Sequence, residues 1–537
     1  MDEKKHVAIF SVTSRPTLRL YSQSPDTQPA KMQPGGVTSP RSVIGDQPVR
    51  RLTLAILLVC FAGFMGPALA GPPQPGPNQP PTKYITRQLT YASGSDWAPD
   101  INGTNVFWWH GSEPGPYQTL LIDPTVDDQI PQTVGIDVAT TTKEITDKYL
   151  YWSKMDAGGK FDTYRAEIKS PLNAQNINNT PNESEALGIA AGEGISWVTE
   201  AHTFQLWHNG QTIDLPNSDG GFMGNYDRNN SDSYVLYRQG PLDNEKLWAY
   251  DIQAQQSTLV SDPTYTWRLA GGPSIDGSKV MWSASYSENG PQHDDYEIYS
   301  YDLIQGAASY QQITHDDFDN LYPKMVDDRV LYIQHQSNQN ASMILEDGSG
   351  TSVLSQTAGN GHDLSKSTAA WKEIDGSIKA LTNGVLFSIA PATTGSSSFS
   401  LSGANIAWDA KDAQNDYQVY AAYYIGPGAV LTGLDLTLEE LSEFSLFNAN
   451  LQYTDLRSAL IEETDFRGAD FTGATNLQYA IGQAIYSHQT ILPEGFNPVS
   501  AGWSYVTPEP GALLLALLGI IALGSCRRRR RATHGNA

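Results

Sequence analysis

Two short segments of the chain place a histidine directly beside two carboxylates, a combination that can bind a metal ion or act as a general base. They are His293-Asp294-Asp295 and His315-Asp316-Asp317. Both lie in turn-like contexts between predicted strands, where polar residues are typical of solvated loops. We therefore favour the loop interpretation and keep a chemical role for the two clusters as an alternative.

The residues around the second histidine are also a candidate cation site. Oxygen ligands for Ca²⁺ could come from four neighbouring residues: Asp316, Asp317, Asp319 and Asn320. Their spacing lacks the central glycine and the distal glutamate of an EF-hand loop. The sequence also lacks a Gly-rich phosphate loop, a His-Glu-x-x-His zinc motif and a Gly-x-Ser-x-Gly nucleophile motif. We expect no catalytic residue, no metal ligand and no cofactor, with Ca²⁺ as the alternative.

Aromatic side chains could form platforms that stack against sugars, and the chain has 12 Trp and 27 Tyr. Most of them occupy predicted strand positions, for example Trp152, Trp282 and Trp408. Aromatic residues are enriched in strands because they pack well on a pleated, half-buried surface. We therefore expect them to form core rather than a sugar-binding surface.

The composition restricts the partner and the compartment. The chain of 537 residues has a formal net charge of −24, which argues against nucleic acid or anionic lipid as a partner. Its two cysteines, Cys60 and Cys526, lie in apolar segments that we expect to be removed. The mature protein would then hold no disulfide, no thiolate nucleophile and no thiolate metal site.

Most of the chain consists of a repeated strand pattern. A turn followed by alternating apolar and polar residues recurs, as in Gly103–Trp108 and Gly277–Trp282. The turns lie near residues 103, 147, 194, 232, 277, 328, 368 and 403. Their mean spacing of about 43 residues is the period of four-stranded propeller blades. We expect a β-propeller over residues 84–425, with eight blades or, because the units near 232 and 368 are weak, seven. The lone strand around Ile85–Thr90 would complete the last blade.

Two motifs of this region resemble a known repeat. Pro-Ser-Ile-Asp-Gly at 273–277 and Tyr-Asp-Leu followed by Gln-Ile-Thr at 301–314 are similar to the TolB-type, WD40-like propeller repeat. The resemblance implies a fold and leaves the function open.

The period then changes from two to five. Between Ala429 and Asn476 an apolar residue occupies every fifth position, and a small residue precedes several of these centres by two. Such units resemble pentapeptide repeats, and that family implies a square β-helix in which both residues point inward. Nine centres make about two coils, fewer than a stacked solenoid needs, so the repeat would lean on a neighbour or be incomplete. An amphipathic helix over 436–446 is the alternative. We expect an irregular spacer over 477–505.

The N-terminus has the pattern of a secretory signal peptide. Arg50-Arg51 precede the apolar run Leu52–Met65, and the small residues Ala68 and Ala70 follow. We predict that residues 1–70 are an N-terminal extension and signal peptide, which signal peptidase cleaves after Ala70. Because the polar part is long, a start at Met32 is an alternative. Residues 71–83 form a Pro-rich linker.

The C-terminus, residues 506–531, has three parts. Pro508, Glu509 and Pro510 precede an uncharged apolar run over 512–526, and five arginines follow it. Clustered arginine stays on the cytoplasmic side of a membrane, which would place the body of the chain outside. The pattern resembles the PEP-CTERM sorting signal of bacterial exosortase substrates. That family implies that Pro508, Glu509 and Pro510 are recognised by a membrane transpeptidase, which removes the apolar tail. An uncleaved tail anchor is the alternative.

Together these patterns predict an all-β protein with a seven- or eight-bladed β-propeller, a short pentapeptide-repeat β-helix and a C-terminal membrane sorting helix. We expect an exported, non-catalytic protein of the cell envelope, outer surface or extracellular matrix, anchored transiently in the inner membrane through 512–526. Its partners would be signal peptidase, an exosortase, and an exopolysaccharide or surface proteins. The alternative is a secreted propeller enzyme, a glycosidase or lyase, which needs two converging carboxylates. A central mouth lined by paired carboxylates or histidine would favour the enzyme, and one lined by Ser, Asn and Gln would favour binding.

Overall fold

The computed structural model describes residues 81–507 except for short gaps. The gaps are 92, 112–116, 125–130, 157, 179–185, 192, 200–202, 217–229, 242–243, 288–294, 336–340, 393–395 and 397. The predicted cleavage residues Ala68 and Ala70, the sorting residues Pro508, Glu509 and Pro510, and the apolar run 512–526 lie outside the described residues. Among the residues that are described, no helix has the length and apolar character needed to cross a membrane.

Apart from two short 3₁₀ turns, the regular structure of the described residues is β. The elements in chain order are β1 (Lys83–Gln88), β2 (Ser95–Asn102), β3 (Asn105–Gly111), β4 (Tyr117–Ile122), β5 (Gln132–Ile145), β6 (Tyr149–Met155), β7 (Phe161–Glu167), β8 (Gln175–Asn176), β9 (Ala186–Ala191), β10 (Gly194–Val198), β11 (Phe204–His208), β12 (Gln211–Asp214), β13 (Tyr234–Gln239), β14 (Lys246–Asp251), β15 (Gln256–Leu259), β16 (Thr266–Asp276), β17 (Lys279–Ser287), β18 (Glu297–Asp302), η2 (Gly306–Ser309), β19 (Gln311–Gln312), β20 (Asp319–Val326), β21 (Arg329–His335), β22 (Ala341–Asp347), β23 (Gly350–Leu364), β24 (Thr368–Glu373), β25 (Ile378–Thr382), β26 (Val385–Ala390), β27 (Phe399–Ser402), β28 (Asn405–Lys411), β29 (Tyr417–Ile425), η4 (Leu477–Tyr479), β30 (Ile485–Tyr486) and β31 (Ser504–Tyr505).

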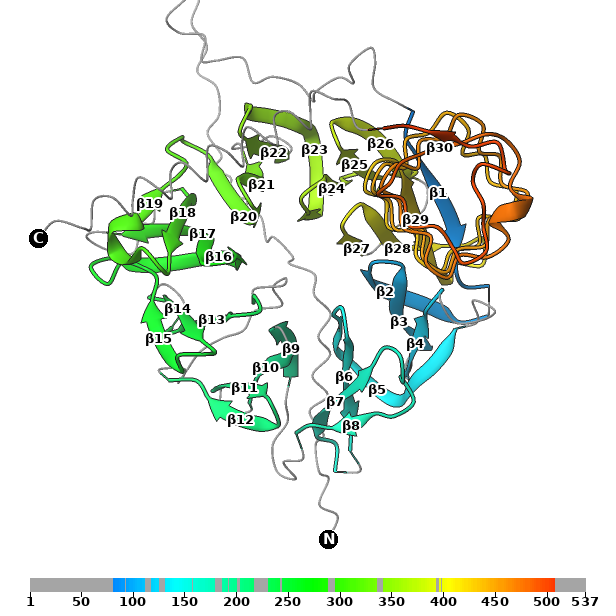
Figure 1. Cartoon of the computed structure of the whole chain (residues 1–537). Helices are drawn as coiled ribbons and strands as arrows, with labels where there is room; N and C mark the ends of the chain where they lie inside the picture. Colours follow the sequence, from blue (N-terminus) through cyan, green and yellow to red (C-terminus); the bar gives the residue numbers. More distant parts are fainter. Residues whose placement is uncertain are drawn as a thin grey trace, which may run out of the picture. The chain divides into compact units, whose positions relative to one another are not determined.

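The strands from β1 to β29 form antiparallel sheets that succeed one another around a common axis, as Figure 1 shows. Three sheets are β9–β12, β13–β15 and β16–β19, and two seven-stranded sheets run from β2 to β8 and from β20 to β26. In each seven-stranded sheet one long strand, β5 or β23, lies in the middle. The pairing of β5 with β6 is interrupted between Val138 and Lys143. That of β23 with β24 is interrupted between Ala358 and His362. This is the architecture of a β-propeller.

The first strand closes the ring, as the sequence predicts. β1 pairs antiparallel with β29 from Lys83↔Ile425 to Gln88↔Tyr420, so that the last sheet has the order β1-β29-β28-β27. Beyond β1, Thr90 Oγ1 donates to Gln418 Oε1 over 2.9 Å and accepts from Val419 N over 2.9 Å. A strand near the start of the described chain thus belongs to the last sheet, where it covers the edge of β29.

Tryptophans form the interior of the sheets rather than a surface. Trp152, Trp282 and Trp408 are at most 3% exposed. These tryptophans lie on β6, β17 and β28. Each stacks on a tyrosine of the next strand along the chain, β7, β18 or β29, with ring centroids 5.6–6.1 Å apart. The tyrosines are Tyr164, Tyr299 and Tyr420. One aromatic pair therefore recurs as a core element, which confirms the core interpretation for these tryptophans.

Residues beyond β29 form a separate coil of parallel bridges. Val430, Asn450, Asp470 and Ile491 bridge in succession, so these four positions stack in one column. The solenoid therefore completes three coils rather than about two. The alternative of a helix over 436–446 is wrong, because these residues form bridges and turns. The centre residues from Leu431 to Phe471 are at most 1% exposed and form its interior.

The five-residue period has a local cause at each corner. The residue two positions after each centre has a positive φ, for example Leu438 at 64° and Tyr453 at 59°. The small residue two positions before the centre is buried, as at Ala459 and Thr464. Thr464 Oγ1 donates to Leu441 O over 2.7 Å, so its hydroxyl is satisfied inside the coil. The inward orientation implied by the pentapeptide resemblance is confirmed.

Both ends of the solenoid are covered. The first coil shares one apolar core with the propeller, and Thr104 Oγ1 donates to Thr432 O over 2.8 Å. At the other end Trp503, 6% exposed, stacks on Phe466 with ring centroids 5.4 Å apart. The prediction of an irregular spacer over 477–505 is therefore corrected, because this segment completes the third coil and caps it. Because the apolar residues of this segment have no fivefold period, the sequence pattern does not indicate that the segment belongs to the coil.

Candidate functional site

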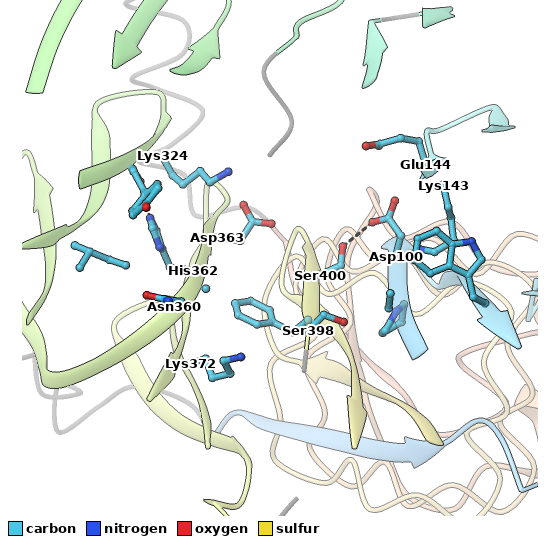
Figure 2. A pocket seen from close by; sticks show the side chains of 17 residues that line it. Asp100, Lys143, Glu144, Lys324, Asn360, His362, Asp363, Lys372, Ser398 and Ser400 are labelled. Carbon is cyan, nitrogen blue, oxygen red and sulfur yellow. Dashed lines mark hydrogen bonds between the residues drawn. The ribbon is translucent and has the colours of Figure 1, made fainter. Parts of the chain in front are cut away.

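A cavity of about 570 Å³ lies where the first strands of several sheets face the propeller axis. Its walls come mainly from β2, β5, β20, β23, β24 and β27, with one residue each from β3 and β21. The polar side chains that line it, labelled in Figure 2, are Asp100, Lys143, Glu144, Lys324, Asn360, His362, Asp363, Lys372, Ser398 and Ser400. The volume lies within the roughly 300–1,000 Å³ typical of small-molecule sites.

A repeated bulge aims these side chains at the axis. The register of β2 shifts between Trp97 and Asp100, where Ala98 has a φ of 50°. That of β20 shifts between Leu321 and Lys324, where Tyr322 has a φ of 56°. A bulge bends its strand and redirects the next side chains. A positive φ is unfavourable for a residue with a Cβ, so neighbouring groups must stabilise these two positions.

Two buried polar side chains hold the bulges in place. Ala98 N donates to Asp409 Oδ2 over 3.0 Å, and Asp409 is fully buried. His362 Nε2 lies 2.7 Å from Tyr322 O, to which it donates. The ring of Tyr322 in turn covers Gly271, where an added Cβ would lie 2.1 Å from the Tyr322 ring. Asp409 comes from β28 of the last sheet, and His362 comes from β23 of the sheet that holds Tyr322. Side chains from strands far apart in the sequence therefore set the shape of the cavity wall.

Asp100 joins three strands around the axis. Its Oδ1 accepts from Ser400 Oγ over 2.7 Å and from Ile101 N over 3.1 Å. Its Oδ2 accepts from Ile145 N over 3.1 Å. Ser274 has a similar role, because its Oγ accepts from Met325 N of the next sheet over 3.0 Å. These side chains hold adjacent sheets together, and Asp100 does so at the edge of the cavity.

Charged residues are distributed unevenly over the cavity, as Figure 2 shows. One wall, from β20, β23 and β24, presents Lys324, Lys372 and Asp363. The opposite wall, from β2 and β5, presents Asp100, Lys143 and Glu144. The first wall therefore has an excess of positive charge and the second an excess of negative charge. Ser398 and Ser400 lie between the two walls in Figure 2.

The surroundings of two of the lysines affect their charged groups. Lys143 Nζ lies 5.7 Å from the ring centroid of Phe107 and 5.3 Å from that of Trp109, within cation–π range. Burial lowers the pKa of the Lys372 ammonium, and the nearby carboxylate of Asp409 opposes this shift. Lys372 is thus a partly desolvated cation, which interacts more strongly with an anion than a surface lysine does.

The lowered pKa of Lys372 gives a pH-dependent contribution to stability. Between that pKa and the ordinary value of 10.5, the folded chain binds fewer protons at this site than the unfolded chain. As pH rises from the lowered pKa of Lys372 to 10.5, this difference in proton binding should therefore increase the free energy of unfolding. We expect K372M to lose this gain, as measured by urea unfolding of both proteins from pH 8 to 10.5. Parallel curves for the two proteins would contradict the prediction.

The histidine–carboxylate clusters seen in the sequence lie elsewhere. His293 and Asp294 are outside the described residues, and His315 is exposed. Asp316 accepts from Phe318 N over 3.0 Å, from Asn320 Nδ2 over 2.9 Å and, through its other oxygen, from Gln334 Nε2 over 2.9 Å. These contacts make Asp316 part of a hydrogen-bonded network beside the buried Glu297, whose pKa burial raises.

Asp319, also considered as a Ca²⁺ ligand, accepts from Tyr296 N over 3.1 Å. Within the described part of the chain, no group of three or more His, Cys, Asp or Glu side chains is placed to hold a metal ion.

A buried histidine–aspartate pair was not noticed in the sequence. Asp96, 2% exposed, accepts from Trp108 Nε1 over 2.8 Å, and His110 Nδ1 lies 2.9 Å from the same oxygen. Burial raises the pKa of Asp96, while these two donors oppose the shift. The pair holds β2 to β3 and does not line the axial cavity.

The cavity residues were also missed by reasoning from the sequence. One signal was present, because Ala98-Pro99-Asp100 and Tyr322-Pro323-Lys324 share a Pro one residue before the axial side chain. A third copy, Gly272-Pro273-Ser274, lies in the motif that resembles the TolB-type repeat. The shared Pro marks the bulge, but the charge of the next residue differs in every copy.

Comparison with known proteins gives two kinds of match. Residues 449–481 match the pentapeptide repeats, in eight copies. The first coil lies outside this match but has the same bridges. Among curated proteins, none matches this sequence.

Several solved structures resemble the fold. The β-propeller domain of the Trilobed protease from Pyrococcus furiosus is 10% identical, with a TM-score of 0.38, covering 62% of this chain and 94% of that one. The designed protein Ika8 is 12% identical, with a TM-score of 0.41, covering 62% and 98%. The Pyrococcus horikoshii acylaminoacyl peptidase is 10% identical, with a TM-score of 0.39, covering 77% and 90%. The description of this chain as a propeller rests on its own sheet topology, and its C-terminal coil is similar to the pentapeptide repeats.

Proposed function

We propose that this chain is an exported, non-catalytic protein of a bacterial surface or extracellular matrix, with a propeller that binds its ligand in the axial cavity. The observation that carries the proposal is the convergence of charged side chains from β2, β5, β20, β23 and β24 on one cavity. Sites of this kind, concave and with a few convergent polar groups, are where small ligands bind.

We also propose that the propeller has eight blades. The long strands β5 and β23 each serve two blades, because their first parts pair with β4 and β22 and their last parts with β6 and β24. Each seven-stranded sheet then divides into two blades. With the sheets that begin at β9, β13, β16 and β27, this division makes eight.

Carboxylates and a histidine line the cavity, which by the criterion given in the sequence analysis favours an enzyme. We nevertheless favour binding, because two of these groups, Asp100 and His362, have structural partners. Asp100 holds two neighbouring strands through Ile145 N and Ser400 Oγ. His362 holds the carbonyl of Tyr322. A group that must stay in one protonation state to hold the scaffold is poorly suited to exchange protons with a substrate.

Export and sorting complete the proposal. Signal peptidase would cleave after Ala70, before β1 begins at Lys83. An exosortase would recognise Pro508, Glu509 and Pro510, which follow directly in sequence after Thr507. Both cleavages would leave the propeller and the capped solenoid intact, and membrane contact through 512–526 would be transient.

The test of sorting compares the native protein from a wild-type host with that from a host lacking the sorting enzyme. Intact mass and C-terminal sequencing should show loss of the arginine-terminated peptide in the wild-type host alone. Fractionation should place that product at the outer surface or in the matrix. Identical C-termini at Ala537 in both hosts would refute the sorting part of the proposal.

A secreted glycan-active enzyme is the second candidate. It is favoured by one observation, the presence of Asp100, Glu144, Asp363 and His362 around the same cavity. A glycosidase or lyase would release reducing or unsaturated ends from a bound glycan, and E144Q or D363N would abolish this release. If the purified protein binds glycans without producing new ends, the enzyme hypothesis fails.

A further inference from the structure

We infer that the axial cavity takes a carboxylated sugar, a uronate unit of an acidic glycan. The inference rests on the proposed function, because it names the ligand class of the same cavity. Three features carry it: lysines gathered from separate strands, hydroxyl-binding groups on both walls, and flat aromatic rings among the lining residues.

The lysines are the first feature. Lys143, Lys324 and Lys372 reach one cavity from β5, β20 and β24, in a chain with a net charge of −24. Asp100, Glu144 and Asp363 line the same cavity, so its formal charges nearly balance, whereas the chain as a whole is strongly acidic. An anionic group is therefore repelled less inside the cavity than elsewhere on the protein and can approach a lysine there. Since burial lowers the pKa of Lys372, its ammonium is less well hydrated, and a carboxylate beside it is correspondingly favoured.

The second feature is the set of hydrogen-bonding groups beside the lysines. Asp363 and Asn360 lie on the same wall as Lys324, and Glu144 lies on the opposite wall. Carboxylate and amide oxygens accept hydrogen bonds from hydroxyls, and amide nitrogens donate to them. A ligand with one carboxylate and several hydroxyls would use both walls at once.

The third feature is aromatic. Phe399 lines the cavity together with these polar groups, as does Trp109, whose ring centroid lies 5.3 Å from Lys143 Nζ. A pyranose ring has apolar C–H faces that can lie against an aromatic ring while its hydroxyls reach polar partners. The cavity of about 570 Å³ holds a ligand of small-molecule size.

The charges also argue against other ligands. A nucleic acid or a densely charged polyanion would be repelled by the net charge of −24 outside the cavity. A ligand with a single carboxylate and neutral hydroxyls is repelled least. A free amino acid is the competing ligand, because its ammonium group could pair with Glu144 or Asp363 and its carboxylate with a lysine.

The experiment measures binding of single uronate units to the purified full chain by calorimetry. The panel contains the methyl glycosides of galacturonate, glucuronate and mannuronate, each of which carries one carboxylate, and the methyl ester of each. The ester keeps the sugar shape and removes the charge, so we expect at least one acid to bind and its ester to bind about tenfold more weakly or worse. The neutral methyl glycoside of glucose serves as a further comparison.

Variants then locate the site. K324Q and K372Q should each weaken binding of the acid about tenfold, since a hydrogen bond to a charged group is lost. K366Q is the matched control, because Lys366 is 78% exposed and pairs with Asp327 over 3.6 Å outside the cavity. This control should bind like the wild type. Equal thermal unfolding of the variants would show that the fold is retained.

Three outcomes would overturn the inference: no acid of the panel binds, acid and ester bind equally, or the acid binds but K324Q and K372Q behave like K366Q. The proposed function fails separately. If a neutral glycan or a peptide binds and the cavity variants weaken it, the cavity is a binding site for another ligand, and the uronate alone is excluded. If the chain is neither exported nor processed, the proposed function fails whatever the cavity binds.

Discussion

Replacing Trp503 by alanine is expected to lower the free energy of unfolding by about 3–5 kcal/mol, the range for large aromatic truncations in a core. The indole closes the open end of the solenoid, where its ring stacks on Phe466 and lies 5.1 Å from that of Phe496 between centroids. Beneath it are the apolar interior residues of the last coil, including Phe471 at 6.2 Å. Without the indole, this interior would be exposed to water.

Terminal coils of solenoids need a cap because each coil buries its apolar face against the next one. Here the propeller covers the first coil, since both share one apolar core. The chain beyond 492 covers the last, with Ser504 N donating to Ala484 O over 2.8 Å. The three-coil solenoid is therefore closed at both ends, which accounts for its formation despite its short length.

Tyr505 offers the matched control for this prediction. It lies on the short strand β31, two residues after Trp503, and its ring contacts Tyr486 at 5.3 Å, but it is 50% exposed. We expect Y505A to change stability by less than about 1 kcal/mol. Urea unfolding measures both variants, and limited proteolysis should cut W503A first within 471–507. A W503A protein that unfolds like Y505A would show that the cap is dispensable.

A chain that begins at Tyr91, and therefore lacks β1, is expected to lose the cooperative unfolding of the ring. β1 supplies the outer strand of the last sheet, with pairs from Lys83 to Gln88. Its removal would expose the edge of β29 and open the propeller where its first strand, β1, pairs with its last strand, β29. Truncation of Tyr84 alone should cost about 3 kcal/mol, the lower end for an aromatic residue because this side chain is only partly buried.

The reason for so large an effect is that β1 contacts several parts of the fold. The ring of Tyr84 lies 5.0 Å from that of Phe387, and its hydroxyl lies 2.7 Å from Thr382 Oγ1 of the neighbouring sheet. On the solenoid side, Lys83 Nζ donates to Glu440 O over 2.6 Å. Arg87 donates to the carbonyl of Asp435. One strand thus holds the last sheet, the preceding sheet and the first coil together.

The control is a chain that begins at Pro81 and keeps β1. Thermal unfolding of the two chains should differ by a lowered and broadened transition in the shorter one. A peptide of residues 81–91 added in trans should restore the sharp transition, because it can refill the vacant strand position. A shorter chain that unfolds like the control would show that β1 does not stabilise the ring.

Much of the fold could be predicted because it repeats with a short period. Alternation around Trp282 and Trp408 indicated strands, and the common turn spacing indicated a propeller. The fifth-position pattern from Leu446 to Phe471 indicated the coil. Each of these signals lies within a few residues of chain, where side-chain periodicity reflects which face is buried.

Where the apolar residues have no regular spacing, the sequence does not predict the role of the segment in the fold. The pattern of residues 477–505 indicates an irregular spacer, because the apolar residues of this region, such as Trp503, are irregularly spaced. Their role depends on the surface that they cover, which is the last coil formed by Phe466 and Phe471. Likewise, His315 and Asp316 are adjacent in the sequence, which suggests a chemical site. In the structure, the Asp316 carboxylate accepts hydrogen bonds from the side-chain amides of Asn320 and Gln334.

The sequence by itself determined the strand-rich repeats, the fivefold coil and the strand that closes the ring, because backbone hydrogen bonding and local burial leave a regular pattern along the chain. The tertiary structure alone decided the cavity. Lys143, Lys324 and Lys372 are far apart in the sequence, and no local pattern relates them. They meet because β5, β20 and β24 lie around one cavity and bulges held by Asp409 and His362 shape its wall.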